Sequence, residues 1–151
     1  WDFTVEALKQ LTEEPNILYL KDASGNVGKI MDIVTTLGHR IRIFSDTSSV
    51  PLFMFLIGGV GWMSGPACVI PVQSIELYEA AHQKRWEEAA ELQKKQWPLN
   101  VAFQRFSLSA CVKAGLEMQG FPVGPPLPPQ KQLDAEGRRT VEGILRSIGA
   151  L

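Results

Sequence analysis

The stretch Ile17-Leu18-Tyr19-Leu20-Lys21-Asp22-Ala23-Ser24-Gly25-Asn26 decides how this chain is interpreted. A run of apolar and aromatic residues ends at one lysine, and small polar residues follow at once. This pattern is typical of a β-strand, Ile17 to Lys21, that places an amine in a pocket. Burial disfavours the charged ammonium, and a neutral amine attacks carbonyl carbons to form Schiff bases. The pattern alone leaves open a strand-end lysine that points into solvent.

Length, composition and charge are those of an ordinary globular domain. The chain has 151 residues, enough for one domain with a core, and 45% of them are hydrophobic. A net charge of -1 without any basic tract gives no reason to expect nucleic acid or an anionic membrane surface as a partner. The apolar run from Val50 to Ile57 is too short to span a bilayer. The chain starts at Trp1 without methionine or a secretory signal, which suggests a fragment or a processed product.

The cysteines and histidines indicate no metal site. Cys68 and Cys111 lie far apart in the sequence, and His39 and His82 each stand alone beside turn or helix-end signals. None of these spacings matches a metal-ligand pattern, so we expect no metal. Two cysteines in a chain of this length suit a reduced, cytoplasmic compartment better than a disulfide scaffold.

The first half of the chain alternates between helices and strands. The predicted helices cover residues 5–13, about 26–38, 51–57 and 71–81, and the predicted strands cover residues 17–21, 41–44 and 61–64. Such alternation with short links predicts parallel strands joined by right-handed crossovers, an α/β fold. The continuous apolar run of the first strand suits a strand that is covered on both faces. Each strand ends in small polar residues, and the carboxyl ends of parallel strands are where ligands bind.

The second half is predicted to be helical. Amphipathic segments cover residues 85–96, 101–107, 108–118 and 134–148, with a break or kink at Pro98. Between the last two lies a proline-rich crossing, Gly120 to Pro129. We expect Phe121, Val123 and Leu127 to anchor this crossing to the helices.

Several motifs together resemble the dihydrodipicolinate synthase/N-acetylneuraminate lyase family of class I Schiff-base lyases. Tyr19 to Asn26 resembles its Schiff-base motif, Phe44-Ser45-Asp46 occupies the place of its next strand end, and Ile57 to Ser64 resembles its glycine-rich turn into the last barrel strand. Trp86 to Ala89, Lys113 to Leu116 and the proline-rich crossing follow in the family's order. The resemblance therefore covers essentially the whole chain.

The resemblance implies a fold and an assembly. The family fold is a (β/α)8 TIM barrel followed by a helical extension, so residues 1–81 would be a partial barrel holding strands six to eight. Residues 82–151 would be the all-helical C-terminal extension. The earlier strands, which carry the family's carboxylate-binding threonines and proton-relay tyrosine, are absent from the sequence. The family also implies a homo-oligomer, a dimer or a tetramer.

The resemblance also implies a chemistry. Lys21 would attack the keto carbon of pyruvate or another 2-keto acid, and the protonated imine would act as the electron sink for an aldolase or a dehydratase. No metal or diffusible cofactor is implied. The residues at positions that contact substrate in relatives are Ser45, Asp46, Ser48, Met63 and Ser64.

Departures from the family pattern bear on the substrate. Relatives commonly have glycine where this chain has Asp46, and a carboxylate there favours hydroxyl groups over an anionic tail. Trp62 is bulkier than the usual aliphatic residue, and the segment from Ser64 to Cys68 departs from the synthase pattern. These departures favour a 2-keto-3-deoxy sugar acid aldolase or dehydratase. The alternatives are dihydrodipicolinate synthase itself, which condenses pyruvate with aspartate semialdehyde, and a non-catalytic half-barrel that acts as an assembly unit. Asp46 could also be only a turn residue.

Overall fold

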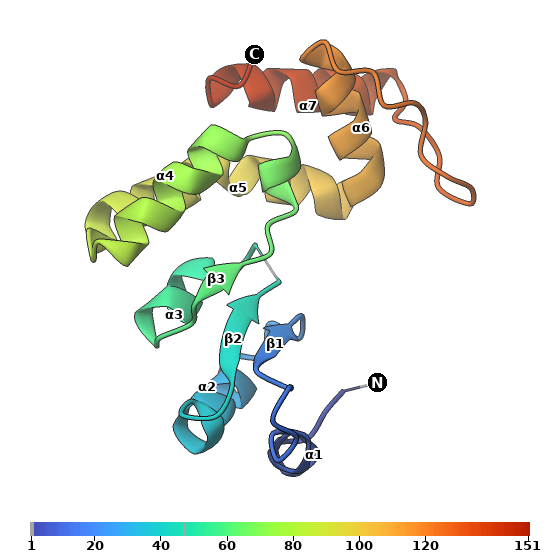
Figure 1. Cartoon of the computed structure of the whole chain (residues 1–151). Coiled ribbons are helices and arrows are strands. Elements are labelled where there is room, and N and C mark those ends of the chain that lie inside the picture. The colour runs from blue at the N-terminus through green and yellow to red at the C-terminus, as the bar shows by residue number, and fades with distance from the viewer. Residues whose placement is uncertain (1, 47) are drawn as a thin grey trace. The chain divides into compact units, whose positions relative to one another are not determined.

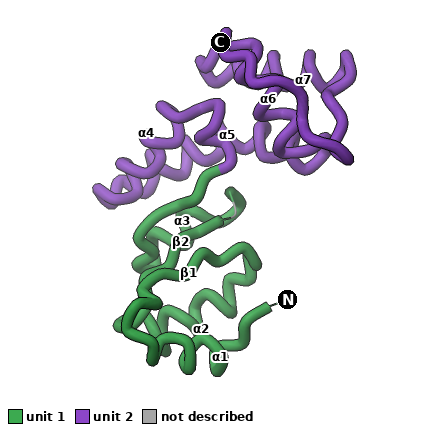
Figure 2. Tube along the Cα trace, turned by 45° about the vertical axis from the view of Figure 1, so that its right-hand side comes forward, with its two compact units in different colours: residues 1–64 green, residues 65–151 purple. Residues whose placement is uncertain are grey.

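The computed structural model describes residues 2–46 and 48–151, which form two compact units (Figure 1, Figure 2). Unit 1 covers residues 1–64 and contains the β-strands, and unit 2 covers residues 65–151 and is helical in its described part. The predicted division between residues 81 and 82 differs from this one, because α4 (Pro71–His82) packs against α5 (Trp86–Arg105). The division into a partial barrel and an extension remains a prediction about the complete fold.

Unit 1 alternates between helices and strands, as predicted. Its elements are α1 (Val5–Leu11), β1 (Tyr19–Asp22), α2 (Val27–Leu37), β2 (Arg42–Ser45), α3 (Pro51–Leu56) and β3 (Gly61–Trp62). The helix ends follow the local sequence: Thr4 Oγ1 accepts the Ala7 N–H at 3.1 Å, and Asn26 Oδ1 accepts the Lys29 N–H at 3.1 Å. Side-chain oxygens at these N-cap positions bind backbone N–H groups that have no partner within the helix.

The three strands form a parallel sheet in the order β1-β2-β3. In the register, Lys21 lies beside Phe44, and Phe44 lies beside Gly61. Pairing extends past β3, because the Met63 N–H donates to the Ser45 carbonyl at 2.7 Å. The predicted parallel α/β arrangement is therefore confirmed, and the carboxyl ends of the three strands lie at one edge of the sheet.

In the described part of unit 1, helices cover one face of this sheet and leave the other open. The core of unit 1 consists of residues from the three helices and from β2 and its approach: Leu8, Ile30, Ile33, Leu37, Ile41, Ile43 and Met54. On β1, Tyr19 is 54% exposed and lies on the opposite face from Leu20, which packs against this core. The prediction that both faces of β1 are covered is therefore wrong for this chain, because its helices reach only one of them.

Unit 2 consists of a short 3-10 helix, η1 (Pro66–Cys68), and four α-helices. These are α4, α5, α6 (Leu108–Met118) and α7 (Ala135–Ser147). Of the break or kink predicted at Pro98, the break is wrong, because α5 continues through this residue. Leu99 and Ala102 on one side of Pro98 and Gln96 on the other are buried, and this packing keeps both halves of the helix in place.

The core of unit 2 holds its helices together through apolar side chains and satisfied amides. The buried residues are Val69, Ile70, Leu99, Ala102, Cys111, Val141, Leu145 and Ile148. Gln119 Nε2 donates to the carbonyl oxygens of Val69 at 2.7 Å and Ala150 at 3.0 Å, joining three segments. None of the described helices is long and apolar enough to span a membrane.

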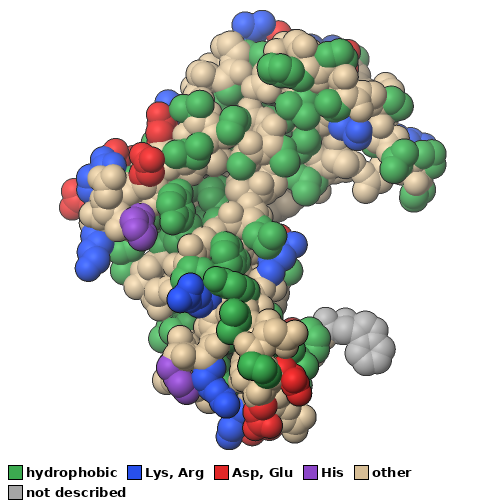
Figure 3. Space-filling model, in the orientation of Figure 1, with side chains coloured by type: hydrophobic (Ala, Val, Ile, Leu, Met, Phe, Trp, Pro, Cys, Tyr) green, Lys and Arg blue, Asp and Glu red, His purple; other side chains and the backbone are tan. Residues whose placement is uncertain are grey.

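The proline-rich crossing between α6 and α7 differs from its prediction. Phe121, Val123 and Leu127 are exposed rather than packed as anchors, and Leu127 reaches 81% exposure. Pro126 is the buried residue of this segment instead. Exposed hydrophobic side chains are not confined to the crossing. Figure 3 shows hydrophobic side chains on the surface of both units.

Candidate active site

Lys21 lies on β1 with its amine next to a carboxylate from the neighbouring strand end. The Lys21 Nζ is 2.8 Å from Asp46 Oδ1. The Asp46 N–H donates to the Asp22 carbonyl at 2.9 Å, so the sheet ladder continues past β2 and fixes the Asp46 backbone beside β1. The two charged groups therefore meet because of strand register.

The Lys21 side chain is 48% exposed in this chain. It lies on the sheet face that the helices of unit 1 leave open, together with Tyr19 and Arg42, whose side chains contact each other. The described helices of unit 1 therefore do not cover the Lys21 side chain. The alternation of side chains along β1 explains this result, since only the face of Leu20 and Asp22 meets the helices.

Phe44 on β2 is the register partner of Lys21, and Gly61 on β3 is the register partner of Phe44. The Phe44 ring lies 5.8 Å from the Tyr19 ring, centroid to centroid. It also lies directly over Gly61, where an added Cβ would come within 2.4 Å of a ring carbon. Gly61 therefore lets the Phe44 ring occupy this place on the open face of the sheet.

The loop after β1 is held by a chain of short-range hydrogen bonds. Asp22 is buried, and its carboxylate accepts the Ser24 N–H at 3.1 Å and the Ser24 hydroxyl at 2.9 Å. The Ser24 Oγ in turn accepts the Asn26 N–H at 3.1 Å. These bonds lead directly into the cap of α2 and fix the backbone that follows Lys21. The spacing Asp-x-Ser is the sequence signal for this turn.

The other predicted site residues differ in accessibility. Ser45 is completely buried and pairs in register with Asp22, which places it on the helix-covered side of the sheet. Ser48 and Ser64 are half-buried, and Met63 is 53% exposed. Thr47, between Asp46 and Ser48, lies outside the described residues. The structure thus joins Lys21 to Asp46, whereas the substrate contacts of all five residues remain predictions.

A cavity of about 370 Å³ in unit 1 is lined by Lys21 itself and by the residues that follow it, from Asp22 to Ser24. Its lining includes Lys29, a second lysine that the sequence analysis missed. The Lys29 side chain is only 15% exposed and forms an ion pair with Asp2. Its position in the first turn of α2, three residues after the Asn26 cap, is the signal that could have pointed to it.

A comparison with known families identifies the chain. The model of the dihydrodipicolinate synthetase family matches residues 1–148. The chain belongs to this family. The predicted membership of the dihydrodipicolinate synthase/N-acetylneuraminate lyase family is therefore confirmed over nearly the whole sequence.

Curated relatives in the dihydrodipicolinate synthetase family carry one enzyme name. The chain is 30% identical to a 4-hydroxy-tetrahydrodipicolinate synthase of Archaeoglobus fulgidus over 145 residues, which are 96% of this chain and 50% of that protein. It is 32% identical to the enzyme of the same name from Methanospirillum hungatei, covering 95% of this chain and 48% of that protein. The chain thus spans about half the length of these relatives.

Solved structures of dihydrodipicolinate synthases have the same fold over this chain. The enzyme from Cyanidioschyzon merolae, solved with lysine bound, matches 100% of this chain and 51% of its own with a TM-score of 0.91 at 25% identity. The enzyme from Thermotoga maritima matches 98% of this chain with a TM-score of 0.89 at 20% identity. These neighbours are TIM barrels, so the α/β part of this chain corresponds to part of a barrel.

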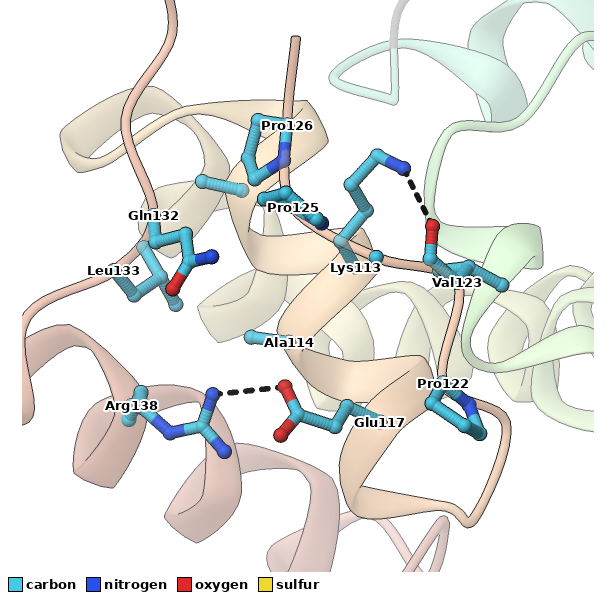
Figure 4. Close-up of a pocket in the computed structure, with 12 residues that line it drawn as sticks. Lys113, Ala114, Glu117, Pro122, Val123, Pro125, Pro126, Gln132, Leu133 and Arg138 are labelled. Atoms are coloured by element: carbon cyan, nitrogen blue, oxygen red, sulfur yellow. Dashed lines mark hydrogen bonds and ion pairs between the residues drawn. The ribbon is translucent and has the colours of Figure 1, made fainter.

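Unit 2 of this family member contains a separate cavity of about 320 Å³ between α6, α7 and the proline-rich crossing (Figure 4). Figure 4 shows that its charged side chains already have partners: Arg138 pairs with Glu117 at 3.1 Å, and Lys113 Nζ donates to the Val123 carbonyl at 3.1 Å. The charged groups that line this cavity thus bind each other and the backbone.

The cysteines of unit 2 differ in their surroundings. Cys68 is exposed, whereas Cys111 is buried and its Sγ lies 3.6 Å from the Ala102 carbonyl oxygen. Desolvation by burial raises the pKa of the Cys111 thiol above its ordinary value of 9.0, against the smaller opposing effect of a hydrogen bond with the Ser107 backbone. Such a thiol is a packed hydrophobic group rather than a nucleophile. Among residues 2–46 and 48–151, no group of three or more His, Cys, Asp or Glu side chains is placed to hold a metal ion.

Proposed function

We propose that Lys21 is the nucleophile of a lysine-dependent lyase, which forms a Schiff base with pyruvate or another 2-keto acid. The observation that carries this proposal is the place of the Lys21 amine, on β1 at the edge where the carboxyl ends of the three parallel strands meet. Ligands bind at this edge in parallel α/β folds. Membership of the dihydrodipicolinate synthetase family supports the same chemistry.

The proposed reaction begins with the unprotonated Lys21 amine. Its lone pair attacks the keto carbon of the substrate and gives a neutral carbinolamine. The carbinolamine hydroxyl then takes up a proton and leaves as water, which gives a protonated imine. The protonated imine withdraws electrons from the carbon next to the imine carbon. That carbon can therefore lose a proton, and a carbon–carbon bond to it can form or break. The chain spans about half of its curated relatives, and this activity is therefore proposed for the catalytic unit in its complete form.

Two substrate classes are open to this chemistry. The names of the relatives support 4-hydroxy-tetrahydrodipicolinate synthesis, for which pyruvate would be the 2-keto acid and aspartate semialdehyde the second substrate. The bulk of Trp62 and the carboxylate of Asp46 support a 2-keto-3-deoxy sugar acid instead. The Lys21–Asp46 ion pair weakens the second argument, because it turns the Asp46 carboxylate toward the amine rather than toward a distal hydroxyl group. We therefore propose the synthase reaction first and the sugar acid reaction second.

Borohydride trapping tests the proposal. Incubation with pyruvate and reduction should give a covalent adduct on the peptide that contains Lys21, detected by mass spectrometry. The adduct should be lost in Lys21→Ala and retained in Lys113→Ala, a matched lysine variant in unit 2. Trapping on other lysines with equal yield, or none on Lys21, would contradict the proposal. Turnover with aspartate semialdehyde or with a 2-keto-3-deoxy sugar acid would then decide the substrate class.

A non-catalytic assembly unit is the second candidate function. Its support is the open face of the sheet, on which Tyr19 is 54% exposed, and the fact that β1 and β3 each have a strand partner on one side only among the described residues. Unpaired edge strands favour association with other strands. Self-association in analytical ultracentrifugation without any Lys21 adduct would support this function, whereas an adduct in a dimer or tetramer would support the enzyme as a homo-oligomer.

A further inference from the structure

Asp46 is the carboxylate nearest to the proposed nucleophile. Its Oδ1 lies 2.8 Å from the Lys21 Nζ, which is within the range for direct proton transfer between a base and its partner. Its backbone N–H is bonded to the Asp22 carbonyl, so the short aspartate side chain starts from a fixed point. The Asp46 side chain is 32% exposed, which leaves room for a small substrate to approach the same two groups.

The other polar groups nearby are engaged elsewhere. The Asp22 carboxylate lies on the helix-covered face of the sheet and is bonded to Ser24. The Tyr19 hydroxyl shares the open face with Lys21 but lies 3.4 Å from an Arg42 nitrogen. Lys29 carries a charge of the wrong sign to accept a proton from an ammonium, and it is paired with Asp2.

We infer that Asp46 is the general acid–base group that moves protons to and from Lys21 while the Schiff base forms. This inference rests on the proposed function of Lys21. The Asp46 carboxylate accepts a proton from the Lys21 ammonium, which leaves a neutral amine and a carboxylic acid. The amine adds to the keto carbon, and a proton moves from nitrogen to the new oxygen to give a neutral carbinolamine.

The second half of the cycle returns the proton. The Asp46 carboxylic acid donates it to the carbinolamine hydroxyl, which leaves as water while the nitrogen lone pair forms the double bond. The products are a protonated imine, water and the original carboxylate. One positive charge is present before and after the sequence, so the step balances without an oxidant or a reductant.

Single-turnover trapping tests this role. The protein is mixed with pyruvate, quenched with borohydride at increasing times, and the adduct on Lys21 is quantified. Asp46→Asn keeps the shape of the side chain but cannot take up the proton, and we expect adduct formation to slow by about 10²-fold, the lower end for general acid–base catalysis. Asp32→Asn, an exposed carboxylate on α2, is the matched control and should leave the rate unchanged.

Chemical rescue separates proton transfer from a structural role. In Asp46→Gly, added formate should restore part of the rate in proportion to its concentration, because a free carboxylate can occupy the vacated space. A residue that only positions the loop would not be replaced by formate. Circular dichroism confirms that each variant is folded, and Asp46→Gly supplies a second variant if Asp46→Asn is not.

The outcomes distinguish the two proposals. If the wild-type protein forms no adduct on Lys21, the proposed function itself fails. If the adduct forms at the same rate in wild type and Asp46→Asn, Lys21 is the nucleophile and the role of Asp46 is wrong. A faster reaction in Asp46→Asn would also overturn it, because the carboxylate would then restrain the amine in its charged form.

Discussion

The two units use their polar residues differently. In unit 1, the ion pair between Lys21 and Asp46 lies on an open sheet face, with the two side chains 48% and 32% exposed. In unit 2, the Nε2 groups of Gln119 and Gln96 donate to backbone carbonyls, whereas Gln96 Oε1 and Ser74 Oγ are buried without a hydrogen-bond partner among the described residues. Buried polar groups need such partners to be tolerated. The charged pair that we propose for catalysis thus lies on the surface of unit 1, whereas the amide donors of unit 2 join its segments.

Removal of the amine of Lys21 should have the largest effect. Lys21→Arg keeps a positive charge and can still pair with Asp46, but a guanidinium stays protonated and cannot form an imine. We expect complete loss of the borohydride-trapped adduct with little change in the free energy of unfolding. Mass spectrometry after trapping and urea unfolding measure the two quantities. A large loss in the free energy of unfolding together with residual adduct would contradict this prediction, because Lys21 would then contribute to stability and would not be the nucleophile.

The sequence predicted the backbone of unit 1 well. The predicted helix starts, at residue 5 and near residue 26, lie next to Thr4 and Asn26, whose side chains cap the two helices. Parallel topology alone predicted that the carboxyl ends of the three strands lie at one edge of the sheet. The same reasoning brought Lys21 and Asp46 to one edge of the sheet, although it did not predict their contact. That contact depends on register, which pairs Lys21 with Phe44 and so places Asp46 one ladder step beyond Asp22.

The errors arose where local signals compete with packing. Pro98 is a helix breaker by sequence, yet buried residues on both sides keep α5 continuous. The exposure of Lys21 could not be read from its apolar run, because the run does not say which of the two sheet faces the chain itself covers. The Phe44–Gly61 contact was equally hidden, since it joins residues from different strands.

Truncation in the core of unit 2 should have the next largest effect. Leu99 is fully buried on α5, and Leu99→Ala should lower the free energy of unfolding by about 2–5 kcal/mol through lost burial and a residual cavity. Val101→Ala, on the same helix at 46% exposure, should change it by less than about 0.5 kcal/mol. Chemical denaturation compares the two. Equal effects would mean that α5 does not pack as described.

Two glycines should respond in opposite directions. Gly61→Ala places a Cβ against the Phe44 ring, and we expect a loss of about 1–3 kcal/mol in the free energy of unfolding from overpacking. Gly143→Ala in α7 meets no neighbouring atom and should stabilise the protein by about 0.4–1 kcal/mol, because the unfolded chain loses freedom. The double variant Gly61→Ala, Phe44→Leu should recover part of the first loss. A stabilising Gly61→Ala would show that the ring does not lie over this residue.

The smallest expected effect is the pH dependence that Cys111 gives to unit 2. Because burial raises the pKa of this thiol, the unfolded chain releases the Cys111 proton at lower pH than the folded protein does. Its contribution to stability is therefore fully present below the ordinary value of 9.0 and is lost as pH rises through the higher folded value. Urea midpoints measured near neutral and at alkaline pH should fall less in Cys111→Ala than in wild type, whereas Cys68→Ala, which changes an exposed thiol, should match wild type. If both variants showed the wild-type slope, the thiol of Cys111 would be open to solvent, and the contrast between a sealed core in unit 2 and an open face in unit 1 would no longer hold.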